Sequence, residues 1–248
     1  MQLSVEAVTE AARARAGLRD FGPDLSLEGL SVFVDALHRE AELTELVQRA
    51  SEPFGPVDIL VNNAAVGGHG TAPSDIPLAL RRTIFEVNLQ APIDLTQQAL
   101  PTMRARGYGR ILNLLSETMH EQPIPHASPQ EVVRSLVVYG ASKLALERYS
   151  FGLAAELFGT GVHVNRLRPQ RVCVTEENSP RALQALSRDP SMAESLEVMA
   201  EAAFLLVAGS YTGLSVTSRQ LLQSAQQPVR SLDGARVVGD ARSVPDLG

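Results

Sequence analysis

The sequence predicts an α/β fold with a doubly wound parallel sheet, in which strands and helices alternate along the chain. Its 248 residues permit one large α/β domain or two small ones. Apolar runs at 57–64, 109–116 and 161–169 are nearly continuous, which is typical of parallel strands covered on both faces. Helical patterns at 78–106 and 139–158 separate these runs. Strand, helix, strand, helix, strand in this order predicts a parallel sheet with crossover helices.

The composition is that of an ordinary globular protein. Hydrophobic residues make up 44% of the chain and charged residues 20%, which excludes a chain that is disordered as a whole. The 22 Lys and Arg residues against 28 Asp and Glu residues give a net charge of −6. A surface of this sign repels phosphate backbones and anionic lipids, so we expect neither a nucleic-acid partner nor a membrane partner.

The chain has one cysteine, Cys173, so it can form neither an internal disulfide nor a zinc site of paired cysteines. A single cysteine in a chain of this length indicates a reducing compartment. No run of eighteen apolar residues occurs, and charged side chains interrupt the start of the chain, so we expect a cytoplasmic protein. The histidines are scattered, and we expect no metal site.

The N-terminal part begins with a predicted helix over residues 4–16, which Gly17 ends. The apolar residues of 25–37 suit either a buried strand or a helix, and periodicity does not decide between them. We favour a strand that ends at Asp35, followed by a helix from about Glu40 to Ala50.

The C-terminal part carries an amphipathic helix over residues 191–208 and one more strand within 213–222. Residues 224–248 are rich in Gln, Gly, Arg, Asp and Pro with little apolar periodicity, which predicts a loose tail. The segment between Ser116 and Tyr139 is expected to be a long loop that shapes a substrate pocket.

Tyr139 and Lys143 lie four residues apart on a predicted helix, so their side chains share one face. A phenol has a reference pKa of about 10, and an adjacent ammonium is expected to lower the pKa of Tyr139 by favouring the phenolate. A tyrosine with a lowered pKa can exchange protons with a substrate near neutral pH. This spacing is common by chance, so it gains weight only from other polar residues.

Other polar residues that support this interpretation follow the predicted strands. Ser116 ends the strand 109–116, at the carboxyl edge where open α/β sheets bind ligands. Each of these polar residues alone has an ordinary structural explanation, such as a strand cap or a satisfied core group. Together they resemble the short-chain dehydrogenase/reductase family over roughly residues 32–222, through NNAA at 62–65, Asn88, Ser116, YGASK at 139–143 and RPQRVCVT at 168–175.

The resemblance implies a Rossmann-like fold and an oxidoreductase that uses NAD or NADP on a small alcohol or carbonyl substrate. It implies that Tyr139 exchanges a proton with the substrate and that Lys143 lowers the pKa of this tyrosine. Ser116 would hold the substrate oxygen, and Asn88 would anchor a water molecule that passes the proton onward. The expected catalytic residues are therefore Asn88, Ser116, Tyr139 and Lys143.

The resemblance also implies a cofactor site. Asp35 would lie against the adenine, Asn62 and Ala64 beside the adenosine half, and Thr175 at the carboxamide, while Lys143 would bind the nicotinamide ribose. The expected cofactor-binding residues are Asp35, Asn62, Ala64, Tyr139, Lys143 and Thr175.

One part of the family's pattern is missing. The glycine-rich turn T-G-x-x-x-G-x-G, whose backbone N–H groups approach the pyrophosphate, does not occur before Asp35. The segment ahead of Asp35 is short, since one βαβ unit alone takes roughly 30 residues or more. Residues 17–24, GLRDFGPD, instead resemble the N-terminal segment of bacterial sulfotransferase-like proteins. We therefore expect a sheet that is incomplete at its N-terminal strands, and impaired cofactor binding.

These observations divide the chain into an atypical helical segment 1–31, a Rossmann-like domain 32–222 and a loose tail 223–248. The favoured function is that of the resembled family, with a noncatalytic subunit or scaffold of the same fold as the alternative. A recombined reading frame would instead lack a cooperative melt. Apolar residues spread widely around helix 139–158, and in the resembled family this helix pairs with its mate, so we expect a homodimer or homotetramer.

Overall fold

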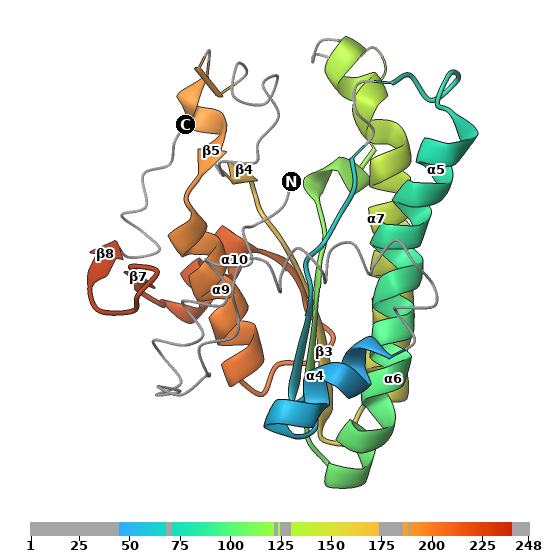
Figure 1. Ribbon diagram of the computed structural model, residues 1–248. Helices are drawn as coiled ribbons and strands as arrows, with labels where there is room; N and C mark the ends of the chain where they lie inside the picture. Colours follow the sequence, from blue (N-terminus) through green and yellow to red (C-terminus); the bar gives the residue numbers. More distant parts are fainter. Residues whose placement is uncertain are drawn as a thin grey trace.

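The fold is built on one parallel sheet, and its elements alternate as expected (Figure 1). Strands β1 (Ile59–Asn62), β2 (Gly109–Leu114), β3 (Val162–Arg168) and β6 (Ser215–Thr217) are all parallel and lie in the order β1-β2-β3-β6. This confirms the predicted α/β fold with a parallel sheet. The computed structural model describes residues 45–67, 71–121, 124, 130–173, 186–187 and 189–239.

One face of the sheet is covered by helices α6 (Ala91–Arg106) and α7 (Gln130–Glu156). Their apolar side chains pack against alternate residues of the central strands, including Ile111, Val162 and Val164. Helix α4 (Leu46–Phe54) packs against α6. Between β1 and α6 run α5 (Leu78–Phe85) and a π-helical turn at Glu86–Gln90.

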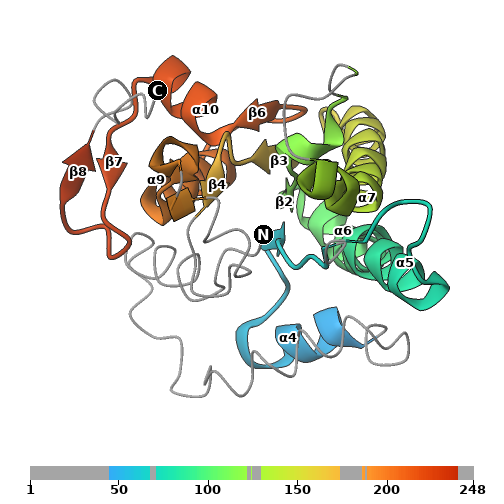
Figure 2. The same cartoon turned by 90° about the horizontal axis from the view of Figure 1, so that it is seen from above.

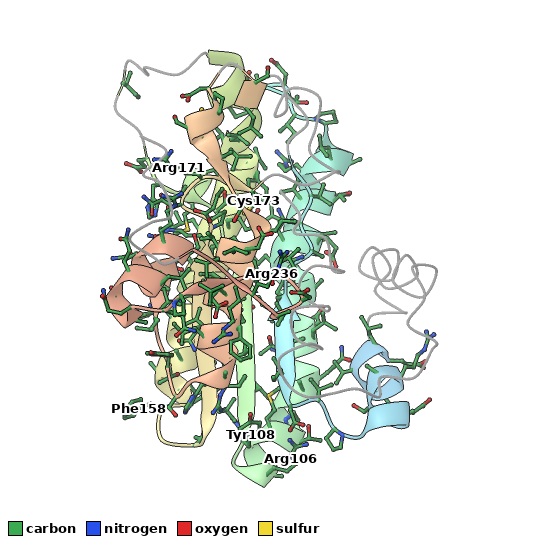
Figure 3. All side chains as sticks on the ribbon, turned by 90° about the vertical axis from the view of Figure 1, so that its left-hand side faces the viewer. Arg106, Tyr108, Phe158, Arg171, Cys173 and Arg236 are labelled. Atoms are coloured by element: carbon green, nitrogen blue, oxygen red, sulfur yellow. The ribbon has the colours of Figure 1, made fainter. Side chains whose placement is uncertain are left out.

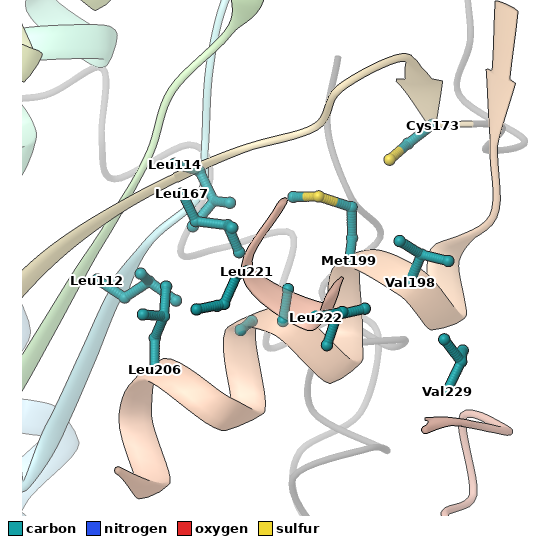
Figure 4. Close-up of a cluster of buried hydrophobic side chains, with 12 residues drawn as sticks. Leu112, Leu114, Leu167, Cys173, Val198, Met199, Leu206, Leu221, Leu222 and Val229 are labelled. Carbon is teal, nitrogen blue, oxygen red and sulfur yellow. The ribbon is translucent and has the colours of Figure 1, made fainter. Parts of the chain in front are cut away.

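The opposite face carries helices α9 (Leu196–Ala208) and α10 (Ser218–Ala225), so helices enclose the sheet from both sides (Figure 2). Leu112, Leu114 and Leu167 point toward this face and form its core with the apolar residues of α9 and α10 (Figure 4). Because it is covered on both faces, β2 has all six residues buried.

Helix α7 begins nine residues before Tyr139, so part of the expected loop between Ser116 and Tyr139 is helical. A 3₁₀ turn at Glu117–Met119 opens that segment. The sequence signal for the helix start was Ser128-Pro129-Gln130-Glu131, which has the S-x-x-E pattern of a capping box with a proline at the first turn.

One C-terminal expectation was confirmed and a second was wrong in part. The segment 213–222 contains the expected strand, β6, which is three residues long, and residues 218–222 belong to α10. The segment 191–208 starts with a 3₁₀ turn at Pro190–Met192 and the short strand β5 (Ala193–Glu194) before α9. Strand β5 pairs in parallel with β4 (Val172–Cys173), which follows β3.

Part of the expected loose tail is folded. Strands β7 (Val229–Arg230) and β8 (Val237–Gly239) form an antiparallel hairpin, and Val229 is buried against the core beside α9. The burial of Val229 anchors the hairpin to the domain.

Several expectations fall on residues outside the described ranges. These are the helix over 4–16, the strand that ends at Asp35 and the resemblance of residues 17–24. Helix α4 ends at Phe54, four residues beyond the expected end at Ala50. In the parts of the chain that the structure describes, no helix is long and apolar enough to cross a membrane.

Candidate active site

The candidate site lies at the carboxyl ends of the parallel strands, where Ser116 follows β2 and faces the middle of α7. The Ser116 hydroxyl caps the 3₁₀ turn by accepting the Thr118 N–H at 3.3 Å and the Thr118 hydroxyl at 2.9 Å. Helix α7 approaches this turn closely because residue 140 is glycine: a Cβ there would lie 2.2 Å from the Thr118 carbonyl oxygen. This contact brings Tyr139 within hydrogen-bond reach of Ser116.

Tyr139 and Lys143 are both buried, with 4% and 2% of their surfaces exposed. The Tyr139 phenol forms a hydrogen bond with the Ser116 side chain. The Lys143 Nζ donates a hydrogen bond to the Leu114 carbonyl oxygen at 2.8 Å and lies 5.8 Å from the centre of the Tyr139 ring. The structure therefore brings three of the four expected catalytic residues together at the end of β2.

The pKa of Tyr139 differs from our expectation. Burial raises the pKa of the phenol to about 12, and the hydrogen bond from Ser116 opposes this rise only in part. Burial also lowers the pKa of the Lys143 ammonium to about 8. The expected net lowering of the Tyr139 pKa is wrong for this geometry, because the loss of phenolate hydration on burial outweighs the stabilisation by neighbouring groups.

Asn88 lies in the π-helical turn and is fully buried. Its side chain accepts the Val66 N–H at 2.7 Å and donates to the Val66 carbonyl oxygen at 3.0 Å. The same amide donates to Ser142 Oγ at 3.0 Å, and Ser142 in turn donates to the Tyr139 carbonyl oxygen at 2.7 Å. Asn88 thus ties the segment after β1 to α7 beside the tyrosine, and its water-anchoring role stays a prediction.

A second chain of buried polar residues runs under the site. The Asn62 amide donates to Asn113 Oδ1 at 2.7 Å, and Asn113 donates to Ser150 Oγ at 2.7 Å. Sequence reasoning missed Ser142, Asn113 and Ser150, although Asn113 stands out as a polar residue inside an apolar strand. The network fixes the end of β1, where Asn62 is buried and Ala64 is half-buried.

The segment Pro169–Cys173 leaves β3 and borders the site. Arg168 pairs with Glu117 in the 3₁₀ turn, and the Thr217 hydroxyl lies 3.4 Å from the Gln170 side-chain oxygen. Arg171 and Cys173 lie toward the end of the molecule opposite Tyr108 and Arg106 (Figure 3). The expected cofactor residues Asp35 and Thr175 lie outside the described residues.

Comparison with known proteins agrees with the resemblance. A family model described as short chain dehydrogenase matches residues 10–184. The match includes the strands β1, β2 and β3 and all four expected catalytic residues. It begins within the segment 1–31 that the sequence pattern sets apart.

Relatives and solved structures give the same picture. The ketoacyl reductase HetN of Nostoc sp. is 36% identical over 135 residues, which cover 54% of this chain and 43% of HetN. This chain thus matches less than half the length of that relative, and 54% of an uncharacterised Staphylococcus saprophyticus oxidoreductase.

Among solved structures, the 3-oxoacyl (acyl-carrier-protein) reductase of Agrobacterium tumefaciens with NADP bound has a TM-score of 0.61 at 28% identity, covering 73% of this chain and 70% of that one. The gluconate 5-dehydrogenase of Burkholderia cenocepacia, in complex with NADP and tartrate, has a TM-score of 0.64 at 20% identity, covering 84% and 88%. The second likeness concerns the fold alone.

Proposed function

Because the chain belongs to the short chain dehydrogenase family, we propose that it is an oxidoreductase that interconverts a ketone and a secondary alcohol with a nicotinamide cofactor. The observation that carries this proposal is the buried cluster of Ser116, Tyr139 and Lys143 at the carboxyl end of β2. A hydroxyl, a phenol and an ammonium at this edge can hold a carbonyl oxygen and move one proton to or from it.

The residues present fit the nicotinamide half of such a cofactor. An ammonium has three N–H donors, and the described residues supply one acceptor for Lys143, the Leu114 carbonyl oxygen. The remaining donors of this buried ammonium suit the hydroxyls of a ribose. NADP is the first choice, since the Agrobacterium tumefaciens reductase carries it.

When bound, the reduced cofactor supplies the hydride. Ser116 orients the substrate carbonyl, because its own O–H can donate while its oxygen is held by Thr118. Tyr139 donates its phenolic proton to the carbonyl oxygen as charge develops there. The Lys143 ammonium beside the ring then stabilises the phenolate that remains.

Near neutral pH the protonation states of Tyr139 and Lys143 suit the reduction of a ketone. A phenol with a pKa of about 12 is protonated and can act as an acid, whereas oxidation of an alcohol needs the phenolate as a base. Lys143, with a pKa of about 8, is mostly charged at pH 7.

The first substrate to test is a 3-ketoacyl thioester. Both HetN and the Agrobacterium tumefaciens protein carry names that denote reductases of this type, and each is more than a quarter identical to this chain. The alternative function is a noncatalytic subunit that keeps the fold and its contact surfaces.

Cofactor affinity distinguishes these two functions and is expected to be low. We find no glycine-rich turn of the family's type in these 248 residues, and without its backbone N–H donors a pyrophosphate would be held less tightly. We predict that calorimetric titration of the 248-residue protein with NADPH gives a dissociation constant weaker than micromolar. Competition with excess NADP+ is the control for specific binding. A micromolar or tighter constant would contradict impaired binding, and no binding at millimolar NADPH would favour the noncatalytic subunit.

The proposed assembly is a homodimer through α7. Large apolar residues recur every seven positions along this helix and the turn after it, and all of them are exposed: Val137, Leu144, Phe151 and Phe158. A seven-residue repeat is the spacing of helix-to-helix packing. Beside this row, a groove of about 830 Å³ runs between α6 and α7.

We predict that Phe151→Glu converts the dimer to a 26.6 kDa monomer. About half of the Phe151 surface is exposed, and the Arg148 and Arg166 guanidinium groups lie 5.5 and 5.6 Å from the centre of its ring, so the change should cost little inside one subunit. Leu153 of the same helix is buried in its own domain and is unsuitable for this test. Sedimentation equilibrium measures the mass, with the equally exposed Val237→Glu on β8 as control. A wild-type protein that is already monomeric at micromolar concentration would refute the assembly.

A further inference from the structure

A buried carboxylate lies outside the proton-transfer cluster. Glu194 in β5 is 1% exposed, and its side chain is fully enclosed. Its Oε1 accepts the Ser218 hydroxyl at 2.5 Å, and its Oε2 lies 3.5 Å from Arg219 Nε. Ser218 and Arg219 are the first two residues of α10, so the carboxylate sits at the start of that helix.

The same carboxylate also reaches the segment that leaves β3. Burial raises the pKa of the Glu194 carboxyl, and the Gln170 backbone N–H and the Arg171 guanidinium lie near enough to oppose this rise. The side chain of Gln170 meets Thr217, the N-cap of α10, at 3.4 Å. Through these contacts Glu194 joins three parts of the chain: β5, the start of α10 and the segment Pro169–Cys173.

Another polar contact of the segment Pro169–Cys173 is the hydrogen bond that Arg171 donates to the Ser191 carbonyl oxygen. Strand β4 of this segment consists of two residues and, within the described ranges, pairs with β5, the strand that carries Glu194. Cys173 is buried at the end of the α9 core, as Figure 4 shows, whereas Gln170 is exposed and Arg171 half-buried. Pro169 and Cys173 are buried at the two ends of the segment, so the exposed Gln170 and the half-buried Arg171 between them depend on polar contacts for their positions.

We propose that Glu194 is a positioning residue that holds the Pro169–Cys173 segment against α10 and thereby shapes the wall of the cofactor site. The inference rests on the proposed function, because it assigns this segment to the nicotinamide side of the site. The segment follows β3 directly, next to the carboxyl end of β2 where Ser116 stands. A wall that is already held in place removes part of the ordering cost of binding.

Glu194→Gln is the variant that tests this role, since it keeps the size of the side chain and removes the charge. The matched control is Glu201→Gln in α9. Glu201 is also 1% exposed, but it accepts the Gln227 side chain at 3.0 Å and the Arg230 N–H at 3.2 Å, at the β7 hairpin. Each variant removes one buried carboxylate, but only the Glu194 carboxylate faces the segment Pro169–Cys173. Ser218→Ala is a milder third variant in case Glu194→Gln does not fold.

Two measurements separate the possible outcomes. Hydrogen exchange of the amides at 170–173 needs no ligand, and Glu194→Gln should accelerate it about tenfold, as expected from the loss of a charged hydrogen bond. Glu201→Gln should leave this exchange unchanged. The NADPH dissociation constant should rise about tenfold in Glu194→Gln and stay within about twofold in Glu201→Gln.

Each result has one meaning. Unchanged exchange at 170–173 in Glu194→Gln, or equal acceleration in both carboxylate variants, overturns the positioning role. Faster exchange with unaltered NADPH affinity overturns the link to the cofactor site. A wild-type protein without measurable NADPH binding refutes the proposed function instead, and the exchange data still decide whether Glu194 holds the segment.

Discussion

Tyr139→Phe is expected to lower the rate of ketone reduction by about 10²-fold to 10⁴-fold, the usual contribution of a positioned acid or base. The substitution removes one hydroxyl from a buried ring and leaves the packing of α7 in place. It also removes the hydrogen bond with Ser116, which should change the free energy of unfolding by only about 1 kcal/mol. Steady-state rates and urea unfolding of the same preparations measure both effects.

The matched control is Tyr149→Phe, ten residues further along α7. Tyr149 is half-buried on the α6 side and packs against the cluster of Leu115, Met119 and Leu146, and the structure shows no hydrogen bond from it to Ser116, Tyr139 or Lys143 among the described residues. Loss of the Tyr149 hydroxyl should leave the rate of ketone reduction within about twofold of the wild-type rate, since substitutions of exposed or partly buried residues away from the site act mainly on stability. A Tyr139→Phe protein with most of its activity would show that the tyrosine is only a packed helix residue.

Lys143→Met is expected to be nearly as damaging to turnover. Methionine fills a similar volume but cannot stabilise a phenolate or bind a ribose hydroxyl. Because the variant removes a buried cation, the protein should stay folded and become more stable near neutral pH. Activity that survives this change would contradict the assigned role of Lys143.

The ionisation of Lys143 can be measured directly, since it is the only lysine of the chain. Protein with ¹³C-labelled lysine should give one resonance that titrates with a pKa of about 8 rather than the ordinary 10.5. Between these values the unfolded state binds more protons than the folded state, so wild-type stability gains from rising pH over this range. Lys143→Met should lack this gain. A resonance that titrates near 10.5 would contradict the burial of the ammonium.

The sequence was sufficient to predict the parallel sheet and the cluster of Ser116, Tyr139 and Lys143 at its carboxyl edge. Continuous apolar runs fixed the central strands to within a few residues, because strands covered on both faces leave no polar position. The spacing of Tyr139 and Lys143 placed both side chains on one helix face, and Ser116 followed from its position after β2.

The features that the sequence did not predict depend on contacts between segments that are far apart in the chain. The expected lowering of the Tyr139 pKa came from a neighbouring charge, whereas its burial under β2 and the 3₁₀ turn appears only in the folded chain. Glu194 could not be singled out from the sequence, since nothing nearby in the chain reveals Ser218 or Gln170 as partners. The hairpin at 229–239 is anchored by Val229, a single apolar residue that local composition did not single out.

Transfer of deuterium from the reduced cofactor to a substrate tests the central claim most directly. A single-turnover reaction would contain excess enzyme, millimolar NADPH deuterated at the hydride position and a 3-ketoacyl thioester, with mass spectrometry of the product. The proposed function predicts a deuterated 3-hydroxyacyl product with wild-type protein and a loss of about 10²-fold or more in its rate with Tyr139→Phe. No deuterated product from wild-type protein with this or other ketones, or equal rates in the two proteins, would contradict the claim.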